Sequence, residues 1–232
     1  MDPVSVARAF VHHAHPAAEC SILGGSAGTG KATANSDLDI VILYPNGHSN
    51  YAETTRYQGW VVEAFVHTPD SISFWYEKER AARCAVLGDI VAQGVLLTDQ
   101  GAGESLQDSA RRYMEKGPEP LSETERGIRL YGLSNSLDDL NGSADPAEKF
   151  AISADVFTQA VDLLLLHENA WLGKGKWMVR RLDQLPQNQL ARQLLAWAGS
   201  GKHDELALAR ITSEVLRQAG GYVMEGFVRG SR

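Results

Sequence analysis

Apolar residues follow two different patterns along the chain, and the pattern changes close to the middle of the chain. In the first half, short apolar runs between glycine-containing breaks predict strands at residues 20–23, 38–43 and 60–66. In the second half, apolar residues recur at the spacing of an amphipathic helix almost throughout. The pattern therefore predicts a strand-containing domain over residues 1–117 and a helical domain over residues 118–232.

Helices and one further strand complete the predicted first domain. Apolar periodicity predicts helices over residues 4–14, 71–87 and 104–116, and a last strand over residues 91–97. The Gly-Pro-Glu-Pro segment that starts at residue 117 is typical of a domain boundary. The predicted fold class is α+β or α/β, with a small mixed sheet as the core of the domain.

The second domain is predicted to be an all-helical bundle. Ser122 and Glu125 have the spacing of a capping box and mark the start of its first helix. The predicted helices cover residues 122–139, 146–169, 177–185, 187–197 and 204–218.

Two carboxylates lie one residue apart at the start of the second predicted strand. Asp37 and Asp39 alternate with the apolar residues Leu38 and Ile40. In a strand, residues i and i+2 point to the same face, about 7 Å apart along the chain. Two ionised carboxylates at this distance repel each other unless a cation or a proton lies between them, and Mg²⁺ is commonly held by such oxygen ligands together with substrate phosphates. The pair predicts a metal-dependent phosphate site.

Two other interpretations compete for this segment. The plainer one is a solvated strand start, in which both carboxylates point to water. The other is a P-loop, because residues 25–31 match Gly-x4-Gly-Lys. That motif requires Ser or Thr next and a helix after it, whereas Ala32 follows here and the chain then enters a β-branched run. The P-loop is therefore excluded.

The segment resembles the nucleotidyltransferase superfamily, which includes DNA polymerase β and the aminoglycoside nucleotidyltransferases. The similarity lies in Gly-Gly-Ser at residues 24–26 and in Asp-Leu-Asp-Ile at residues 37–40, with a short helix or loop expected between them. The resemblance implies transfer of a nucleoside monophosphate from ATP or another nucleoside triphosphate to a hydroxyl, with release of pyrophosphate and with two Mg²⁺ ions. Gly25 and Ser26 would bind the phosphates, assisted by Ser36, because glycine allows close backbone approach and helix N-termini favour anions.

The same resemblance implies a third carboxylate on a neighbouring strand. Glu63 is the only charged residue in the apolar run at residues 60–66, and a lone charge in such a run is costly unless it is paired or bound to metal. Alternatively, Glu63 lies at an exposed position on an edge strand and binds no metal. Aspartate is the commoner residue at this position in the family, so the role of Glu63 stays open: metal ligand, general base, or both.

Charge and cysteine content limit the acceptor and the compartment. A net charge of −7 and a pI near 5.5 argue against a nucleic-acid acceptor. No stretch of about 20 apolar residues suggests a membrane span, and the N-terminus lacks the features of a signal peptide. Cys20 and Cys84 are expected to be buried free thiols. We therefore expect a cytoplasmic enzyme, with its oligomeric state left open.

Basic residues in the helical domain offer a further phosphate contact. Lys174 and Lys176 lie in a glycine-broken link between two helices and could bring ammonium groups to the triphosphate, or could belong to a solvated turn. Imidazoles at the spacing of His12, His13 and His15 do not converge on one face, so we expect exposed or partner-contacting side chains there.

The expected acceptor is a small, cationic molecule with a hydroxyl group, as in the aminoglycoside enzymes. A protein side chain is the alternative acceptor. A regulatory or antitoxin-like protein that keeps the fold without turnover is the non-enzymatic alternative, and the complete set of three carboxylates argues against it.

Overall fold

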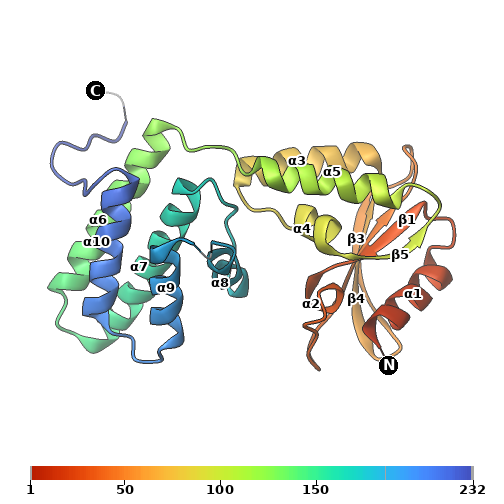
Figure 1. The fold of residues 1–232 in the computed structure, drawn as a ribbon, viewed down its shortest axis with the longest axis horizontal. Coiled ribbons are helices and arrows are strands. Elements are labelled where there is room, and N and C mark those ends of the chain that lie inside the picture. The colour runs from red at the N-terminus through yellow and green to blue at the C-terminus, as the bar shows by residue number, and fades with distance from the viewer. Residues whose placement is uncertain (1, 186, 231–232) are drawn as a thin grey trace. The chain divides into compact units, whose positions relative to one another are not determined.

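The computed structural model describes residues 2–185 and 187–230 and divides into two compact units, Met1–Gly117 and Pro118–Arg232. The division falls at the boundary that the sequence suggests. Figure 1 shows that the first unit holds all the strands and that the second consists of helices. The fold is therefore an α/β unit followed by a helical unit, as predicted.

A five-stranded mixed sheet forms the centre of the first unit, in the order β3-β4-β2-β1-β5. Strands β2 and β4 are parallel, and the other neighbouring pairs are antiparallel. The strands are β1 (Cys20–Leu23), β2 (Leu38–Leu43), β3 (Tyr51–Tyr57), β4 (Trp60–His67) and β5 (Val95–Asp99).

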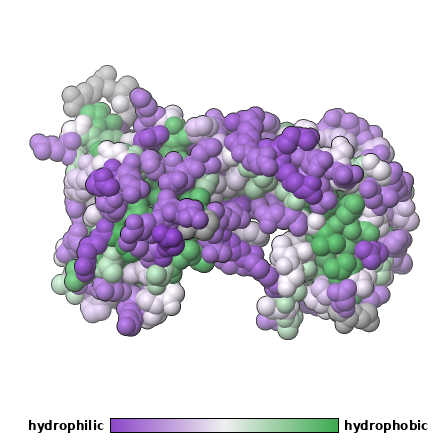
Figure 2. Space-filling view, in the orientation of Figure 1, coloured by the Kyte–Doolittle hydropathy of each residue, from purple (hydrophilic) through white to green (hydrophobic). Residues whose placement is uncertain are grey.

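Helices cover both faces of this sheet (Figure 1). Helix α1 packs with the apolar cluster on one face, and helices α3, α4 and α5 contribute to the cluster on the other. In the space-filling view, hydrophobic residues of this unit gather over the strands (Figure 2). The helices of the unit are α1 (Pro3–Ala14), α2 (Gly25–Gly28), α3 (Pro69–Ala82), α4 (Leu87–Gln93) and α5 (Gly103–Lys116).

The helix predicted over residues 71–87 is wrong at its C-terminal end. Helix α3 ends at Ala82 because Arg83 adopts the left-handed conformation, with φ of 59°. A separate helix, α4, then begins at Leu87. The Glu79 carboxylate caps it by accepting hydrogen bonds from the backbone N–H groups of Val86, Leu87 and Gly88.

Two strand predictions also need correction. The last strand begins at Val95 and not at residue 91, because Val91 belongs to α4 and Gly94 caps that helix. Strand β3 was not predicted at all. Most of its residues are exposed and polar, so it has no apolar alternation, and it forms the edge of the sheet beside β4.

Within residues 118–185 and 187–230, five helices build the second unit. Capping residues begin four of them: Ser122, Asp145, Asn188 and Asp204 each accept a backbone hydrogen bond at the helix start. The observed bounds differ from the predicted ones by up to three residues. The helices are α6 (Glu123–Gly142), α7 (Pro146–His167), α8 (Lys176–Asp183), α9 (Gln189–Gly199) and α10 (Glu205–Ala219).

Helix α7 corrects the expectation that no segment could span a membrane. By length and composition alone, its 22 residues with a mean hydropathy of 1.3 could cross a bilayer. However, Val156, Ala160 and Leu164 are buried in the apolar core of the second unit, against α6 and α10. Core helices of folded domains pass the same test, so α7 is weak evidence for a membrane span.

Candidate functional site

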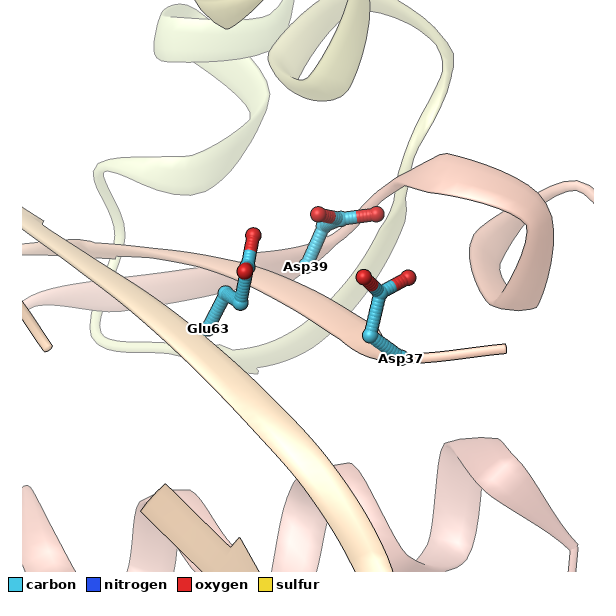
Figure 3. A group of neighbouring side chains, drawn as sticks. All are labelled: Asp37, Asp39 and Glu63. Atoms are coloured by element: carbon cyan, nitrogen blue, oxygen red, sulfur yellow. The ribbon is translucent and has the colours of Figure 1, made fainter. Parts of the chain in front are cut away.

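Three carboxylates converge on one face of the sheet. Asp37 directly precedes β2, Asp39 lies within it, and Glu63 lies directly opposite Asp39 on the parallel strand β4. One carboxylate oxygen from each residue lies within 4.8 Å of the others. Figure 3 shows the three side chains pointing to the same side of the strands. The structure therefore brings together the carboxylates that the sequence singles out.

The alternation along β2 explains this placement. Leu38, Ile40 and Ile42 are fully buried in the cluster that α1 covers. Asp37 and Asp39 must then face the other side, where Val41 packs with residues of α3 and α4. All three carboxylates are half-buried, so the sheet holds them in place while they remain accessible from one side.

The glycine-serine turn lies beside this face. The Gly24 N–H donates to the Asp39 carbonyl over 2.8 Å, which ties the turn to β2. Helix α2 covers Gly25–Gly28, so it is one turn long and begins within the Gly-Gly-Ser segment instead of after it. The first N–H groups of a helix have no partner within it, and here they belong to the predicted phosphate-binding residues.

Two serines join the ends of the following loop. The Ser26 hydroxyl, 8% exposed, donates to the Ser36 hydroxyl over 2.8 Å. The Ser36 hydroxyl also accepts from the Thr33 N–H over 2.9 Å. Ser36 therefore holds the loop in shape next to Asp37. In this arrangement the Ser26 hydroxyl proton is used within the loop, which leaves its backbone N–H as the donor for an anion.

The donor set suits a hard divalent cation. Three carboxylates close together favour a cation among them, and ligand sets made only of oxygen suit Mg²⁺, Ca²⁺ or Mn²⁺. Within the described residues 2–185 and 187–230, this is the one group of three or more His, Cys, Asp or Glu side chains placed to hold a metal ion. The identity of the metal and the roles of the three residues remain predictions.

Lys174 and Lys176 are exposed in the second unit, before and at the start of α8. Burial raises the pKa of the nearby Asp162 carboxyl, whereas Arg129 and Lys174 act in the opposite direction. Lys174 thus interacts with an acid of its own unit. Its contact with phosphate, and that of Lys176, remains a prediction.

The histidine prediction is wrong for one residue. His12 and His13 are exposed, but His15 is only 5% exposed. Its Nδ1 lies 3.2 Å from the Tyr44 hydroxyl, and its Nε2 lies 3.7 Å from a Glu53 oxygen. Burial lowers the pKa of His15, with Glu53 acting in the opposite direction.

The cysteine prediction is confirmed in part. Neither cysteine forms a disulfide within the described residues, but only Cys20 is buried, and Cys84 is half-buried. Burial raises the pKa of the Cys20 thiol to about 12, so this side chain behaves as an inert apolar residue.

A cavity of about 380 Å³, which no sequence pattern predicted, lies on the same face of the sheet as the carboxylates. Residues of β3, β4, α3 and α4 line it, among them Phe65, His67 and Trp75. The local signal was weak because β3 has no apolar pattern and because α4 was not predicted: the predicted helix ended at residue 87, and a strand was expected from residue 91. The spacing of Glu63, Phe65 and His67 along β4 was the one available indication.

In a comparison with known protein families, residues 16–93 match the family model described as "Nucleotidyltransferase domain". This range contains the Gly-Gly-Ser turn and all three carboxylates. A nucleotidyltransferase-like protein from Exiguobacterium sibiricum 255-15 is structurally similar, with 14% identity over 92% of this chain and 74% of that chain. The TM-score of this comparison is 0.41. No curated protein matches the chain. The match confirms the predicted nucleotidyltransferase domain for residues 16–93.

Proposed function

We propose that the nucleotidyltransferase domain formed by residues 16–93 moves a nucleoside monophosphate from ATP to a hydroxyl group of a small molecule in the cytoplasm. Nucleotidyl transfer in general follows from the family match. One observation supports the further inference that the reaction depends on a metal ion. Oxygens of Asp37, Asp39 and Glu63 lie within 4.8 Å of one another beside the Gly-Gly-Ser turn.

The three carboxylates would hold Mg²⁺. When bound, Mg²⁺ neutralises phosphate charge and favours attack by an oxygen nucleophile. Asp39 is tied to the turn through its own backbone, because its carbonyl accepts the Gly24 N–H. A displacement of the turn therefore also displaces the carboxylate, so phosphate binding and metal binding depend on the same segment of chain.

The proposed reaction forms one bond and breaks one. The acceptor hydroxyl oxygen bonds to the α-phosphorus, and the bond from that phosphorus to the bridging oxygen of pyrophosphate breaks, with its electron pair leaving on pyrophosphate. The hydroxyl proton passes to the Glu63 carboxylate or to water. Glu63 suits this task because it lies on β4, on the side of β2 away from β1 and the turn that follows it.

The turn would bind the phosphates. Gly25 and Ser26 offer the N–H groups of the first turn of α2, and Ser36 supports the loop. Lys174 and Lys176 are further candidates for binding phosphate. The net charge of −7 supports a small-molecule acceptor over a polynucleotide, and a protein hydroxyl is the alternative that the same chemistry would serve.

The test combines binding and turnover. We expect ATP to raise the thermal unfolding temperature clearly only when Mg²⁺ is present, and Asp39→Asn to lose both this shift and pyrophosphate release. Asp70→Asn is the matched control, because Asp70 is an exposed aspartate of α3. Equal stabilisation of wild type and Asp39→Asn by Mg-ATP would contradict the assignment. Labelled nucleotide appearing in polynucleotide, with none in small molecules or protein, would contradict the proposed acceptor.

A further inference from the structure

The cavity of about 380 Å³ in the first unit has mainly apolar walls. Ala52 of β3 and Phe65 of β4 lie on the sheet side, and Trp75, Val86 and Leu87 lie on the helical side. The Glu79 carboxylate in the lining is already occupied, since it accepts the N–H groups that begin α4. A cationic group would therefore find little to pair with here.

The cavity begins next to the carboxylates. Glu63 and Phe65 are two residues apart on β4, so their side chains share a face and lie about 7 Å apart. The register of the β3–β4 pair continues this relationship, since Thr54 lies opposite Glu63 and Ala52 lies opposite Phe65. The apolar walls thus start at the next residue pair on this face of the sheet, two residues beyond Glu63.

The cavity also lies on the side where an acceptor must enter. The phosphate-binding turn follows β1, on one side of β2, whereas β4 and β3 lie on the other side. In a phosphoryl transfer the attacking and leaving oxygens are roughly in line, on opposite sides of the phosphorus. With pyrophosphate leaving toward Gly25 and Ser26, the attacking hydroxyl lies toward Glu63, and the rest of the acceptor extends toward β3.

We propose that this cavity selects the acceptor by binding a compact apolar group, such as an aromatic ring, that lies beside the reacting hydroxyl. The inference rests on the proposed function and deepens it, because it assigns the acceptor to apolar hydroxyl compounds. It differs from the cationic acceptor expected from the sequence. Ala52, Phe65 and Trp75 are then the residues that determine specificity.

Ala52→Phe is the sharpest test variant. Ala52 is exposed on an edge strand, so a phenyl ring there fills the cavity without removing a buried group. Ala81→Phe is the matched control, because Ala81 is exposed on α3 and does not line the cavity. Both variants should fold, and both should keep the stabilisation by Mg-ATP, since neither position touches the turn or the carboxylates.

The acceptor panel contains phenyl-substituted alcohols with one to four carbons between ring and hydroxyl, glycerol, and a polyamino sugar. We expect wild type and Ala81→Phe to use the phenyl alcohols best. Ala52→Phe should lose at least about tenfold in kcat/KM for them, because pockets discriminate even single methylene groups by about 10- to 200-fold. Preference for the polyamino sugar, or equal use of phenyl alcohols by Ala52→Phe and wild type, would overturn the inference while leaving nucleotidyl transfer intact.

A binding experiment separates this inference from the proposed function. Saturation-transfer NMR with indole measures occupation of the cavity without turnover. Indole signals that are present with wild type and Ala81→Phe and lost with Ala52→Phe support the cavity assignment, even for a protein that transfers no nucleotide. Absence of indole signals with wild type, or equal signals with Ala52→Phe, overturns it. Failure of Mg-ATP to stabilise wild type counts against the proposed function alone.

Discussion

Gly25 and Asp39 are so close that no side chain fits between them. A Cβ atom built on Gly25 would lie 1.9 Å from Oδ2 of Asp39. Gly25 also has φ of +60°, a conformation that other residues rarely adopt. The glycine therefore has a second purpose beyond backbone approach to phosphate: it leaves room for a carboxylate of the predicted metal site.

Gly25→Ala should displace the Asp39 side chain and abolish the Mg²⁺-dependent stabilisation by ATP. Gly30→Ala is the matched control, because Gly30 has a similar φ of +70° in the same loop and nothing within 4 Å of an added Cβ. Both variants carry a backbone cost of about 1–2 kcal/mol, so their thermal stability should fall similarly. Thermal unfolding with and without Mg-ATP measures both the loss of stability and the loss of nucleotide binding. Equal nucleotide binding by the two variants would show that the close approach of Gly25 to Asp39 is not needed for binding.

Glu63→Gln should lower turnover at least about 10²-fold if Glu63 is a metal ligand or a general base. The substitution keeps the volume and removes one negative charge. Glu53→Gln on β3 is the control, because Glu53 lies opposite Ala64, whose side chain is on the other face of the sheet. Turnover measured against Mg²⁺ concentration separates the two roles: a ligand loses metal affinity, and a base loses turnover at saturating Mg²⁺. Nearly normal turnover would identify Glu63 as a structural residue.

If Lys174 and Lys176 bind phosphate as the sequence predicts, the double variant Lys174→Ala, Lys176→Ala should bind Mg-ATP about tenfold more weakly, because two positive charges are removed. Lys202→Ala, an exposed lysine of the same unit, should bind as wild type does. Isothermal titration gives the Kd of each variant. An unchanged Kd in the double variant would assign Lys174 and Lys176 to a solvated turn.

Stability should fall as the pH drops below about 6.5, in part because of His67. This imidazole is 9% exposed with Nδ1 2.9 Å from the Ser71 hydroxyl, and burial lowers its pKa from the ordinary value of 6.5. The unfolded chain then binds the proton more readily than the folded one. The stabilisation is fully present above pH 6.5, the pKa of the unfolded chain, and is lost as the pH falls through the lower pKa of His67 in the folded protein.

Urea unfolding at pH 7.5 and 5.5 tests this expectation. His67→Gln should show a smaller loss of stability between the two pH values than wild type, and one proton can account for at most about 1.4 kcal/mol per pH unit. His12→Gln is the control because His12 is exposed. His15, also buried with a lowered pKa, contributes in the same direction and remains in both variants. An equal pH dependence in wild type and His67→Gln would exclude His67 as a cause.

Local sequence was enough for the features that depend on short spacing. The alternation of Asp37 and Asp39 with apolar residues indicated β2, its buried face and the carboxylates on the opposite face. The Gly-Gly-Ser turn together with this pair indicated the family, and periodicity indicated the helical unit. These signals are local because strand alternation and helix periodicity are properties of consecutive residues.

The features that depend on pairing between distant segments could be seen only in the tertiary structure. The register of two parallel strands places Glu63 opposite Asp39, and no local signal specifies that register. Strand β3 is held by its hydrogen bonds to β4 and has little apolar pattern of its own, so only pairing reveals it. The contact of Gly25 with Asp39 and the cavity beside Glu63 arise where β1, β2, β3 and β4 come together in the sheet, because packing between separate elements, and not sequence spacing, sets those distances.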